Sequence, residues 1–291
     1  MEFTIENEYL QVRVNAFGAE LTGVVCKADG VEHIWEGDPA LWGDHAPILF
    51  PYTGRLKDGK MEVKGRLVES GIHGFAKDQE HTLVCKTKDT LVLQLTENAE
   101  TLAVWPYKFR LLSAFALDGN TLRHSLTVEN RGGEDFSFGI GFHPGFRVPF
   151  DGKHTYEDYE LRFSHMESPL CASTPNGLLT GQFYYLGKNI HTLALDETLF
   201  ANDSHCMLNL TSKTLGLYEK DSGRAVICDI GGFPYTLIWS EVGAPRFVCI
   251  EPWHSLPGGE TDSYAWEERA HAATLAPGET WSTTMCTSYV R

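Results

Sequence analysis

Apolar residues recur at every second position along most of this chain, and this spacing constrains the fold more than any other feature. Successive side chains of a β-strand point to opposite faces, so the spacing predicts extended segments that each bury one face. The clearest examples are Leu10, Val12 and Val14; Leu91, Leu93 and Leu95; and Leu122, Leu126 and Val128. We recognise about fifteen short segments of this kind, which predicts a protein built mainly of strands.

Turn-forming residues separate the predicted strands at spacings that favour hairpins. They include residues 28–30 (Ala-Asp-Gly), 117–120 (Leu-Asp-Gly-Asn) and 130–133 (Asn-Arg-Gly-Gly). Short connections join antiparallel strands, whereas parallel strands need long crossovers. Helical patterns are confined to residues 38–42, with Pro39 near the start, and to residues 99–104, shortly before Pro106. We therefore predict helices that serve only as short connections.

A chain with this many strands must close or stack its sheets to avoid exposed edges. No linker-like segment divides the 291 residues, and no fixed-period repeat suggests a propeller or a solenoid. We predict an all-β fold, a large antiparallel β-sandwich, in which residues 1–291 form a single domain.

Charge and cysteine content narrow the function classes. The chain has 39 acidic and 24 basic residues, and its net charge of -15 repels nucleic acids and anionic membranes. No stretch approaches the ~18 apolar residues of a membrane helix, and the N-terminus does not resemble a signal peptide. Seven scattered cysteines without a Cys-x-x-Cys pair favour reduced thiols. We expect a cytoplasmic protein with a small-molecule partner, as a monomer or a homodimer.

Four segments interrupt the alternation with polar residues beside Gly or Pro. They are residues 50–55 (FPYTGR), 73–77 (HGFAK), 141–146 (GFHPGF) and 249–253 (CIEPW). Each places a charged or titratable side chain among apolar neighbours, which costs free energy unless the group serves a function. Sequence patterns of nucleotide-binding loops, G-x-S-x-G hydrolases and zinc proteases are absent. One shared site formed by the four segments would explain them together.

Glu251 and His143 are the candidate proton-transfer residues. Glu251 follows the apolar run 246–250 and precedes Pro252, which we expect to end the strand so that the carboxylate points into a cleft. The alternative is a buried glutamate neutralised by an arginine. His143 ends a predicted strand over residues 136–142 and is a candidate acid. The alternative for His143 is a core histidine with all its hydrogen bonds satisfied.

Taken in order, these segments resemble the aldose 1-epimerase (galactose mutarotase-like) family, and in particular its LacX-like bacterial branch. The matching segments are Trp42, residues 46–51 (APILFP), 54–56 (GRL), 73–75 (HGF), 105–109 (WPYKF), 143–144 (HP), Trp239, residues 251–253 (EPW) and 275–279 (LAPGE). They span almost the whole chain. The resemblance implies the large β-sandwich of that family, with the ligand cleft across one sheet.

The resemblance also implies roles for individual residues. By this likeness, Glu251 is the general base, His143 the general acid, and Arg55 and His73 hold sugar hydroxyls. Asp203 matches a further sugar-binding carboxylate, although Asp196 lies close by in the sequence. No cofactor or metal is implied. Two positions depart from the family pattern, because Lys77 replaces an arginine and Gly145 replaces an aromatic residue, which would remove a wall of the cleft.

The chemistry of such an enzyme is the interconversion of α and β anomers of an aldohexose. A base takes the proton of the anomeric hydroxyl while an acid protonates the ring oxygen, so the ring opens and can close again on either face. We expect Glu251 to be ionised at pH 7 and His143 to act as an imidazolium. Tryptophan rings would cover the apolar face of the sugar, and the candidates are Trp42, Trp239 and Trp253, each of which has core packing as its alternative role.

Three other functions remain open at this point. A non-catalytic sugar-binding module would explain the sandwich and the aromatic residues. A metalloenzyme would use His73, His143 and Glu251 as ligands. A hexose-6-phosphate mutarotase would need cations at the cleft rim, and the sequence offers Lys57, Lys77 and Arg147 for that purpose.

Overall fold

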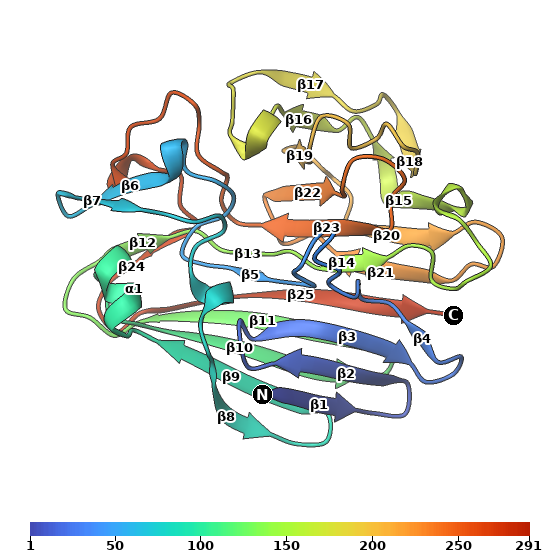
Figure 1. The fold of residues 1–291 in the computed structure, drawn as a ribbon, viewed down its shortest axis with the longest axis horizontal. Coiled ribbons are helices and arrows are strands. Elements are labelled where there is room, and N and C mark those ends of the chain that lie inside the picture. Colours follow the sequence, from blue (N-terminus) through green and yellow to red (C-terminus); the bar gives the residue numbers. More distant parts are fainter.

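The computed structural model describes residues 1–291 and consists of 25 strands with one short α-helix and five short 3₁₀ helices (Figure 1). Every pairing between these strands is antiparallel, as predicted. The expected number of about fifteen strands was too low, because many strands contain only two or three residues and carry no readable alternation.

Two large sheets form the body of the molecule. In spatial order, the nine-stranded sheet contains β18 (Ile190–Ala194), β15 (Tyr159–Glu167), β20 (Thr214–Glu219), β21 (Ala225–Asp229), β25 (Thr280–Val290), β11 (Thr121–Asn130), β10 (Phe109–Asp118), β9 (Thr90–Thr96) and β8 (Thr82–Lys86). The eight-stranded sheet contains β17 (Phe183–Tyr185), β16 (Leu170–Ala172), β19 (His205–Met207), β22 (Tyr235–Trp239), β23 (Phe247–Trp253), β13 (Gly141–Phe142) and β5 (Ile48–Leu49), with β14 (Gly145–Arg147) also paired to β23.

Smaller sheets complete the architecture. The four-stranded sheet contains β1 (Glu2–Glu6), β2 (Leu10–Asn15), β3 (Glu20–Cys26) and β4 (Val31–Glu32); the two-stranded sheets pair β12 (Phe136–Phe138) with β24 (Ala273–Leu275) and β6 (Lys60–Val63) with β7 (Arg66–Glu69). The 3₁₀ helices are η1 (Lys57–Gly59), η2 (Ala76–Asp78), η3 (Tyr156–Asp158), η4 (Pro175–Gly177) and η5 (Trp266–Glu268).

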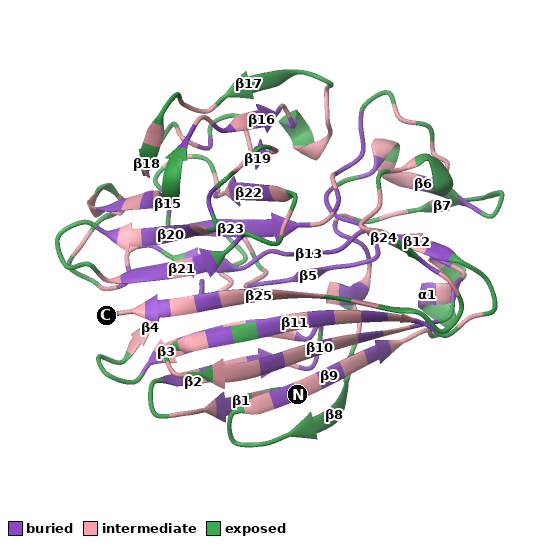
Figure 2. Cartoon of the chain, turned by 180° about the vertical axis from the view of Figure 1, so that it is seen from behind, coloured by how far each residue is buried: buried purple, intermediate pink, exposed green.

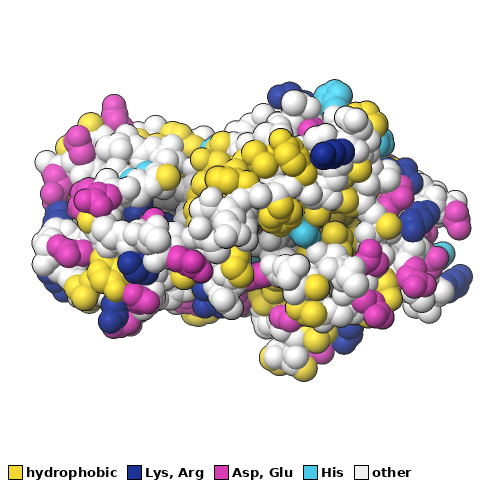
Figure 3. Space-filling view, turned by 90° about the horizontal axis from the view of Figure 1, so that it is seen from above, with side chains coloured by type: hydrophobic (Ala, Val, Ile, Leu, Met, Phe, Trp, Pro, Cys, Tyr) yellow, Lys and Arg dark blue, Asp and Glu magenta, His cyan; other side chains and the backbone are white.

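The β17 strand lies at the edge of the eight-stranded sheet with its aromatic side chains exposed, and Figure 3 shows apolar side chains gathered on this side.

Helices are connections, as predicted. Helix α1 covers Ala99–Val104, and the Asn98 side chain caps it by accepting hydrogen bonds from the N–H groups of Glu100 and Thr101. Residues 38–42 form a single turn in which the Trp42 N–H donates to the Asp38 carbonyl at 2.9 Å. No helix is long and apolar enough to cross a membrane.

The predicted alternation marks the core. The apolar residues of β2 and β9 that recur at every second position are buried, and Figure 2 shows buried and less buried residues alternating along the long strands. A cluster of 53 buried residues, from Ile5 to Tyr289, joins the sheets. The turn at residues 119–120 connects β10 to β11 in a hairpin, as expected. Residues 130–133 do not form a hairpin, because they lead from β11 to β12, and β12 pairs with β24.

The predicted continuous strand over residues 136–142 is wrong, because the chain changes sheets within it. β12 pairs with β24, whereas β13 pairs with β5 and β23. The change occurs at Gly139, where a Cβ atom would collide with the Ser255 side chain and would lie 3.2 Å from Cα of Tyr52. Only a residue without a side chain permits this close approach.

The expectation that Pro252 ends its strand is also wrong, because β23 continues to Trp253 and Pro252 lies opposite Thr236. The His254 N–H donates to the Ile140 carbonyl on the β13 side of the strand. Backbone groups two residues apart point the same way, so the Pro252 nitrogen faces that side too. The register that pairs Gly141 with Trp253 places Pro252 opposite Phe142, the last residue of β13, so the missing N–H removes one ladder hydrogen bond where this pairing ends.

Alternation along β23 determines where Glu251 points. Val248 and Ile250 belong to the main core, whereas Cys249 and Trp253 belong to small clusters on the opposite face. Glu251 shares that opposite face, since its position has the same parity. The carboxyl group therefore points away from the main core from the middle of a strand.

Candidate functional site

A cleft of about 750 Å³ contains all six predicted site residues: Arg55, His73, His143, Asp203, Trp239 and Glu251. Glu251 and Trp239 come from the neighbouring strands β23 and β22, and His143 comes from the connection between β13 and β14. The other three come from loops. The sequence reasoning thus selected residues that the fold brings together, and their individual roles stay predictions.

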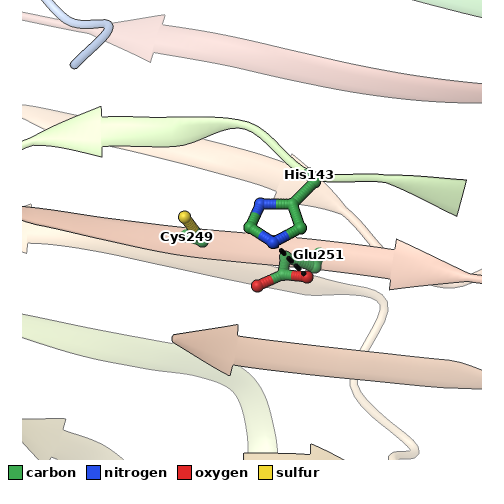
Figure 4. Close-up of side chains that lie close together, drawn as sticks. All are labelled: His143, Cys249 and Glu251. Atoms are coloured by element: carbon green, nitrogen blue, oxygen red, sulfur yellow. Dashed lines mark ion pairs between the residues drawn. The ribbon is translucent and has the colours of Figure 1, made fainter. Parts of the chain in front are cut away.

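His143 and Glu251 are in direct contact (Figure 4). Nε2 of His143 lies 3.2 Å from Oε2 of Glu251, and both residues are buried, at 7% and 1% exposure. Nδ1 of His143 and Oε1 of Glu251 are buried without a hydrogen-bond partner. The alternatives of an arginine-neutralised glutamate and a satisfied core histidine therefore do not apply. Buried polar atoms without partners are unusual, and here they leave hydrogen-bonding capacity for a ligand.

Burial changes the expected protonation of this pair. It raises the pKa of Glu251 well above the ordinary value, with a further contribution from the Asp203 charge, and it lowers the pKa of His143 to about 4. Burial therefore disfavours the expected combination of a carboxylate and an imidazolium at pH 7. A carboxylic acid beside a neutral imidazole holds the same number of protons, and the two forms differ only in the position of one shared proton.

The tautomer of His73 is determined by the backbone. Its Nδ1 accepts a hydrogen bond from the Gly54 N–H at 3.0 Å, so Nε2 of the neutral ring carries the proton. Burial lowers the pKa of His73, which favours this neutral form. His73 therefore offers a donor to the cleft and no lone pair for a metal. The predicted metal set of His73, His143 and Glu251 is not formed in this tautomer.

Arg55 and Asp203 supply charge at the cleft. The exposed Arg55 side chain has no salt bridge, so its guanidinium is available to a ligand. Asp203 has a φ of 74°, and its Oδ1 accepts from the N–H of Ser204. Asp196 does not line the cleft, because its carboxylate accepts hydrogen bonds from the N–H and hydroxyl of Thr198. Asp203 lines the cleft and Asp196 does not, and the sugar-binding role of Asp203 stays a prediction.

Trp42, Trp239 and Trp253 all line the cleft. The Trp42 ring lies 5.1 Å from the His143 ring and 5.5 Å from the Trp239 ring, measured between centroids. Gly145 lies directly beside it, since a Cβ atom there would be 2.6 Å from Cζ3 of Trp42. Trp42 thus places an aromatic ring beside Gly145, and the expected effect of this glycine on the cleft stays a prediction.

The cations considered for a phosphate do not line the cleft. Lys77 forms salt bridges with Asp44 and Asp78, and Lys57 donates to the Asp262 carbonyl. Arg147 is an exposed residue of β14. Among Lys and Arg residues, Arg55 alone lines the cleft, and the acidic residues there are Asp44, Asp203, Glu241 and Glu251.

Sequence patterns did not single out the cleft residues Asp44 and Glu241, nor Cys249, which lies outside the cleft beside His143 and Glu251. The position of Cys249 could have been predicted from the sequence, because it precedes Glu251 by two positions on one strand and therefore shares its face. Asp44 and Glu241 follow Trp42 and Trp239 by two positions, but both lie in loops whose course alternation does not predict.

Comparisons with known proteins extend over almost the whole chain. The sequence matches the aldose 1-epimerase family model over residues 1–286. It is 32% identical over 290 residues to the plasmid-encoded protein LacX of Lactococcus lactis subsp. lactis, covering 96% of each chain. A galactose mutarotase related enzyme from Lactobacillus acidophilus superposes with a TM-score of 0.94 at 28% identity, covering 100% of this chain and 98% of that one. A galactose mutarotase-like protein from Lactobacillus casei gives 0.90 at 27% identity, with 99% and 100% covered.

Proposed function

Since this chain belongs to the aldose 1-epimerase family, we propose that it is a mutarotase that interconverts the α and β anomers of an unphosphorylated aldohexose. The observation that carries the proposal is the contact between His143 and Glu251 at 3.2 Å, in a cleft where each side chain keeps one polar atom without a partner. A sugar-binding module without catalysis gives no reason to bury two titratable groups together.

The pair is suited to a reaction that conserves protons. In the reactive form Glu251 is a carboxylate and His143 is an imidazolium. The anomeric hydroxyl gives its proton to Glu251 while His143 gives its proton to the ring oxygen, so the bond between C1 and the ring oxygen breaks and the aldehyde forms. Afterwards Glu251 is a carboxylic acid and His143 is neutral, which is the form that burial favours. Closure after rotation about C1–C2 reverses both transfers.

Neighbouring residues would hold the sugar in place. Nε2–H of His73 and the Arg55 guanidinium are donors for sugar hydroxyls, and the Asp203 carboxylate is an acceptor. Trp239 and Trp42, whose rings are nearly perpendicular, would cover apolar C–H surface of the pyranose. This arrangement needs no group from outside the chain for either proton transfer.

The charge of the cleft favours a neutral sugar over a hexose 6-phosphate. A phosphate group usually meets several cations or backbone N–H groups, whereas Arg55 is the single Lys or Arg residue lining this cleft. Lys77 is committed to two carboxylates. The phosphorylated substrate is therefore the weaker candidate.

Polarimetry tests the proposal directly. Freshly dissolved α-D-glucose and α-D-galactose should reach anomeric equilibrium faster with catalytic amounts of the protein, and exchange NMR with glucose 6-phosphate should show a smaller acceleration. A larger acceleration with glucose 6-phosphate than with the unphosphorylated sugars would contradict the proposed substrate and indicate a hexose-6-phosphate mutarotase. Binding of the sugars without any acceleration would support the non-catalytic module instead.

A further inference from the structure

His143, Cys249 and Glu251 form a cluster of three different ligand types. One nitrogen, the thiol sulfur and one carboxylate oxygen all lie within 4.8 Å of one another, and all three residues are buried. Figure 4 shows the Cys249 thiol beside the same imidazole that meets Glu251. The proton transfers described above do not use the sulfur, and Cys249 does not line the sugar cleft.

We propose that this cluster is an inhibitory site for a thiophilic divalent cation of the Zn²⁺ class. The cation would take one donor atom from each of His143, Cys249 and Glu251, and a water molecule from the cleft would complete four-coordination. Nitrogen, sulfur and oxygen donors of this kind suit Zn²⁺, whereas the hard ion Mg²⁺ rarely takes thiolate ligands. The inhibitory part of this inference rests on the proposed function, and the binding part does not.

Charge balance favours a cation at this place. Binding converts the Cys249 thiol to a thiolate and removes the proton shared by His143 and Glu251, so two protons leave and three metal–ligand bonds form. Two anionic ligands and a neutral imidazole then neutralise the 2+ charge. A neutral complex avoids the large cost of burying net charge.

Few hydrogen bonds hold the donor groups of this cluster in place. Ligands around tetrahedral Zn²⁺ lie at ~2.0–2.3 Å from the metal, which places them roughly 3.5 Å from one another. Since no two donor atoms are more than 4.8 Å apart, the cluster must contract by at most about 1.3 Å at any separation. Nδ1 of His143 and Oε1 of Glu251 have no hydrogen-bond partners that would oppose this movement. When the cation binds, its bonds to His143 and Glu251 replace the direct contact between these two side chains.

A second cluster with metal-binding residue types, formed by Asp151, His154 and Glu219, already has a cation. The Arg224 guanidinium donates to Asp151 at 2.5 Å and to Glu219 at 2.7 Å. A metal there would have to displace this guanidinium. The cluster around Cys249 has no such competitor.

Isothermal titration with Zn²⁺, and with Co²⁺ as a spectroscopic probe, tests binding independently of catalysis. We expect one ion per chain and a thiolate-to-Co²⁺ charge-transfer absorption. Cys249→Ala should lose that absorption and weaken Zn²⁺ binding by at least ~10-fold. The matched control is Cys228→Ala, which alters a buried cysteine of the other large sheet and should bind as wild type does. Equal Zn²⁺ binding by wild type and Cys249→Ala would overturn the proposal.

The inhibition is measured separately, by polarimetry. Zn²⁺ should abolish the acceleration, EDTA should restore it, and Mg²⁺ should have no effect. Cys249→Ala should keep the basal rate and require at least ~10-fold more Zn²⁺ for the same inhibition. If Cys249→Ala does not fold, Glu251→Gln tests the site by titration alone, because it removes an anionic ligand. Zn²⁺ binding without any mutarotase activity would contradict the proposed function and leave the metal site intact.

Discussion

The charge of Asp203 raises the pKa of the Glu251 carboxyl group, which burial has already raised. A negative charge beside a buried carboxyl group disfavours its ionised form, so Glu251 is held toward the protonated form. His143 stays neutral, because burial lowers its pKa to about 4. The two residues in contact therefore hold one transferable proton between them over a broad pH range, and this proton count is the one that anomer interconversion requires.

The first prediction concerns the pH profile of kcat/KM. Activity should be bell-shaped, because the pair is inactive with two transferable protons and with none. The acid limb should lie near pH 4, where the lowered pKa of His143 allows a second proton to bind. The alkaline limb should lie well above the ordinary pKa of a glutamate, since the raised pKa of Glu251 delays loss of the shared proton. Polarimetry corrected for the uncatalysed rate measures the profile, and circular dichroism at each pH separates it from unfolding. An acid limb at the ordinary histidine pKa would contradict this assignment.

The second prediction compares two aspartates. Asp203→Asn should lower kcat/KM by about 10-fold or more, since the cleft loses a carboxylate acceptor for a sugar hydroxyl. It should also move the alkaline limb to lower pH, because removing the negative charge lowers the pKa of Glu251. Asparagine tolerates the φ of 74° at this position. Asp196→Asn is the matched control and should leave both quantities unchanged, since Asp196 does not line the cleft. Equal effects of the two variants would contradict a role of Asp203 in sugar binding.

The third prediction addresses the proton-transfer pair. Glu251→Gln and His143→Ala should each lower kcat by ~10²–10⁴-fold, the usual contribution of one proton-transfer group. Glu251→Gln should also raise the thermal transition at about pH 8. The folded protein holds a proton on Glu251 that the unfolded chain releases above the ordinary glutamate pKa, so wild-type stability falls as pH rises. Glu8→Gln, an exposed change, is the control for both readouts. Near wild-type turnover in either active-site variant would refute the roles.

The fourth prediction is that residues 1–291 unfold as one domain. The main core cluster contains residues from both ends of the chain, including Ile5 and Tyr289, which supports this organisation. Urea denaturation should give a single transition that coincides when followed by tryptophan fluorescence and by circular dichroism. Two separated transitions would indicate independent units.

Much of the fold could be predicted from local sequence, because alternation and turn chemistry are local properties. The buried faces of β2 and β9 and helix α1 follow from residues within each segment. The break between β12 and β13 could not be predicted in this way, since it depends on Tyr52 and Ser255, which approach Gly139 from distant parts of the chain. Likewise, Pro252 lies inside β23 at the point where the pairing with β13 ends, which depends on strands far away in the sequence.

The candidate site shows the same division. Its residues stood out because polar groups interrupt apolar segments, and the family resemblance supplied the roles. Their protonation could not be predicted, because the pKa values of Glu251 and His143 depend on burial by residues far apart in the sequence. The salt bridge between Lys77 and Asp44 also joins residues far apart in the sequence. It occupies the Lys77 ammonium group, which is therefore not free to bind a ligand.

The last prediction concerns Gly145 and Trp42. Gly145→Ala places a methyl group 2.6 Å from the Trp42 ring and 3.2 Å from the backbone carbonyl of His45. Because the carbonyl cannot move easily, the Trp42 ring must shift, and it lies against both His143 and Trp239. We expect kcat/KM to fall by about 10-fold, with a loss of stability of about 1–3 kcal/mol, as overpacking of a buried site typically costs. Gly133→Ala is the matched control, because a Cβ atom there meets nothing within 4 Å. Polarimetry and thermal denaturation measure the two effects, and unchanged activity in a destabilised Gly145→Ala would mean that Trp42 supports the fold without shaping the cleft.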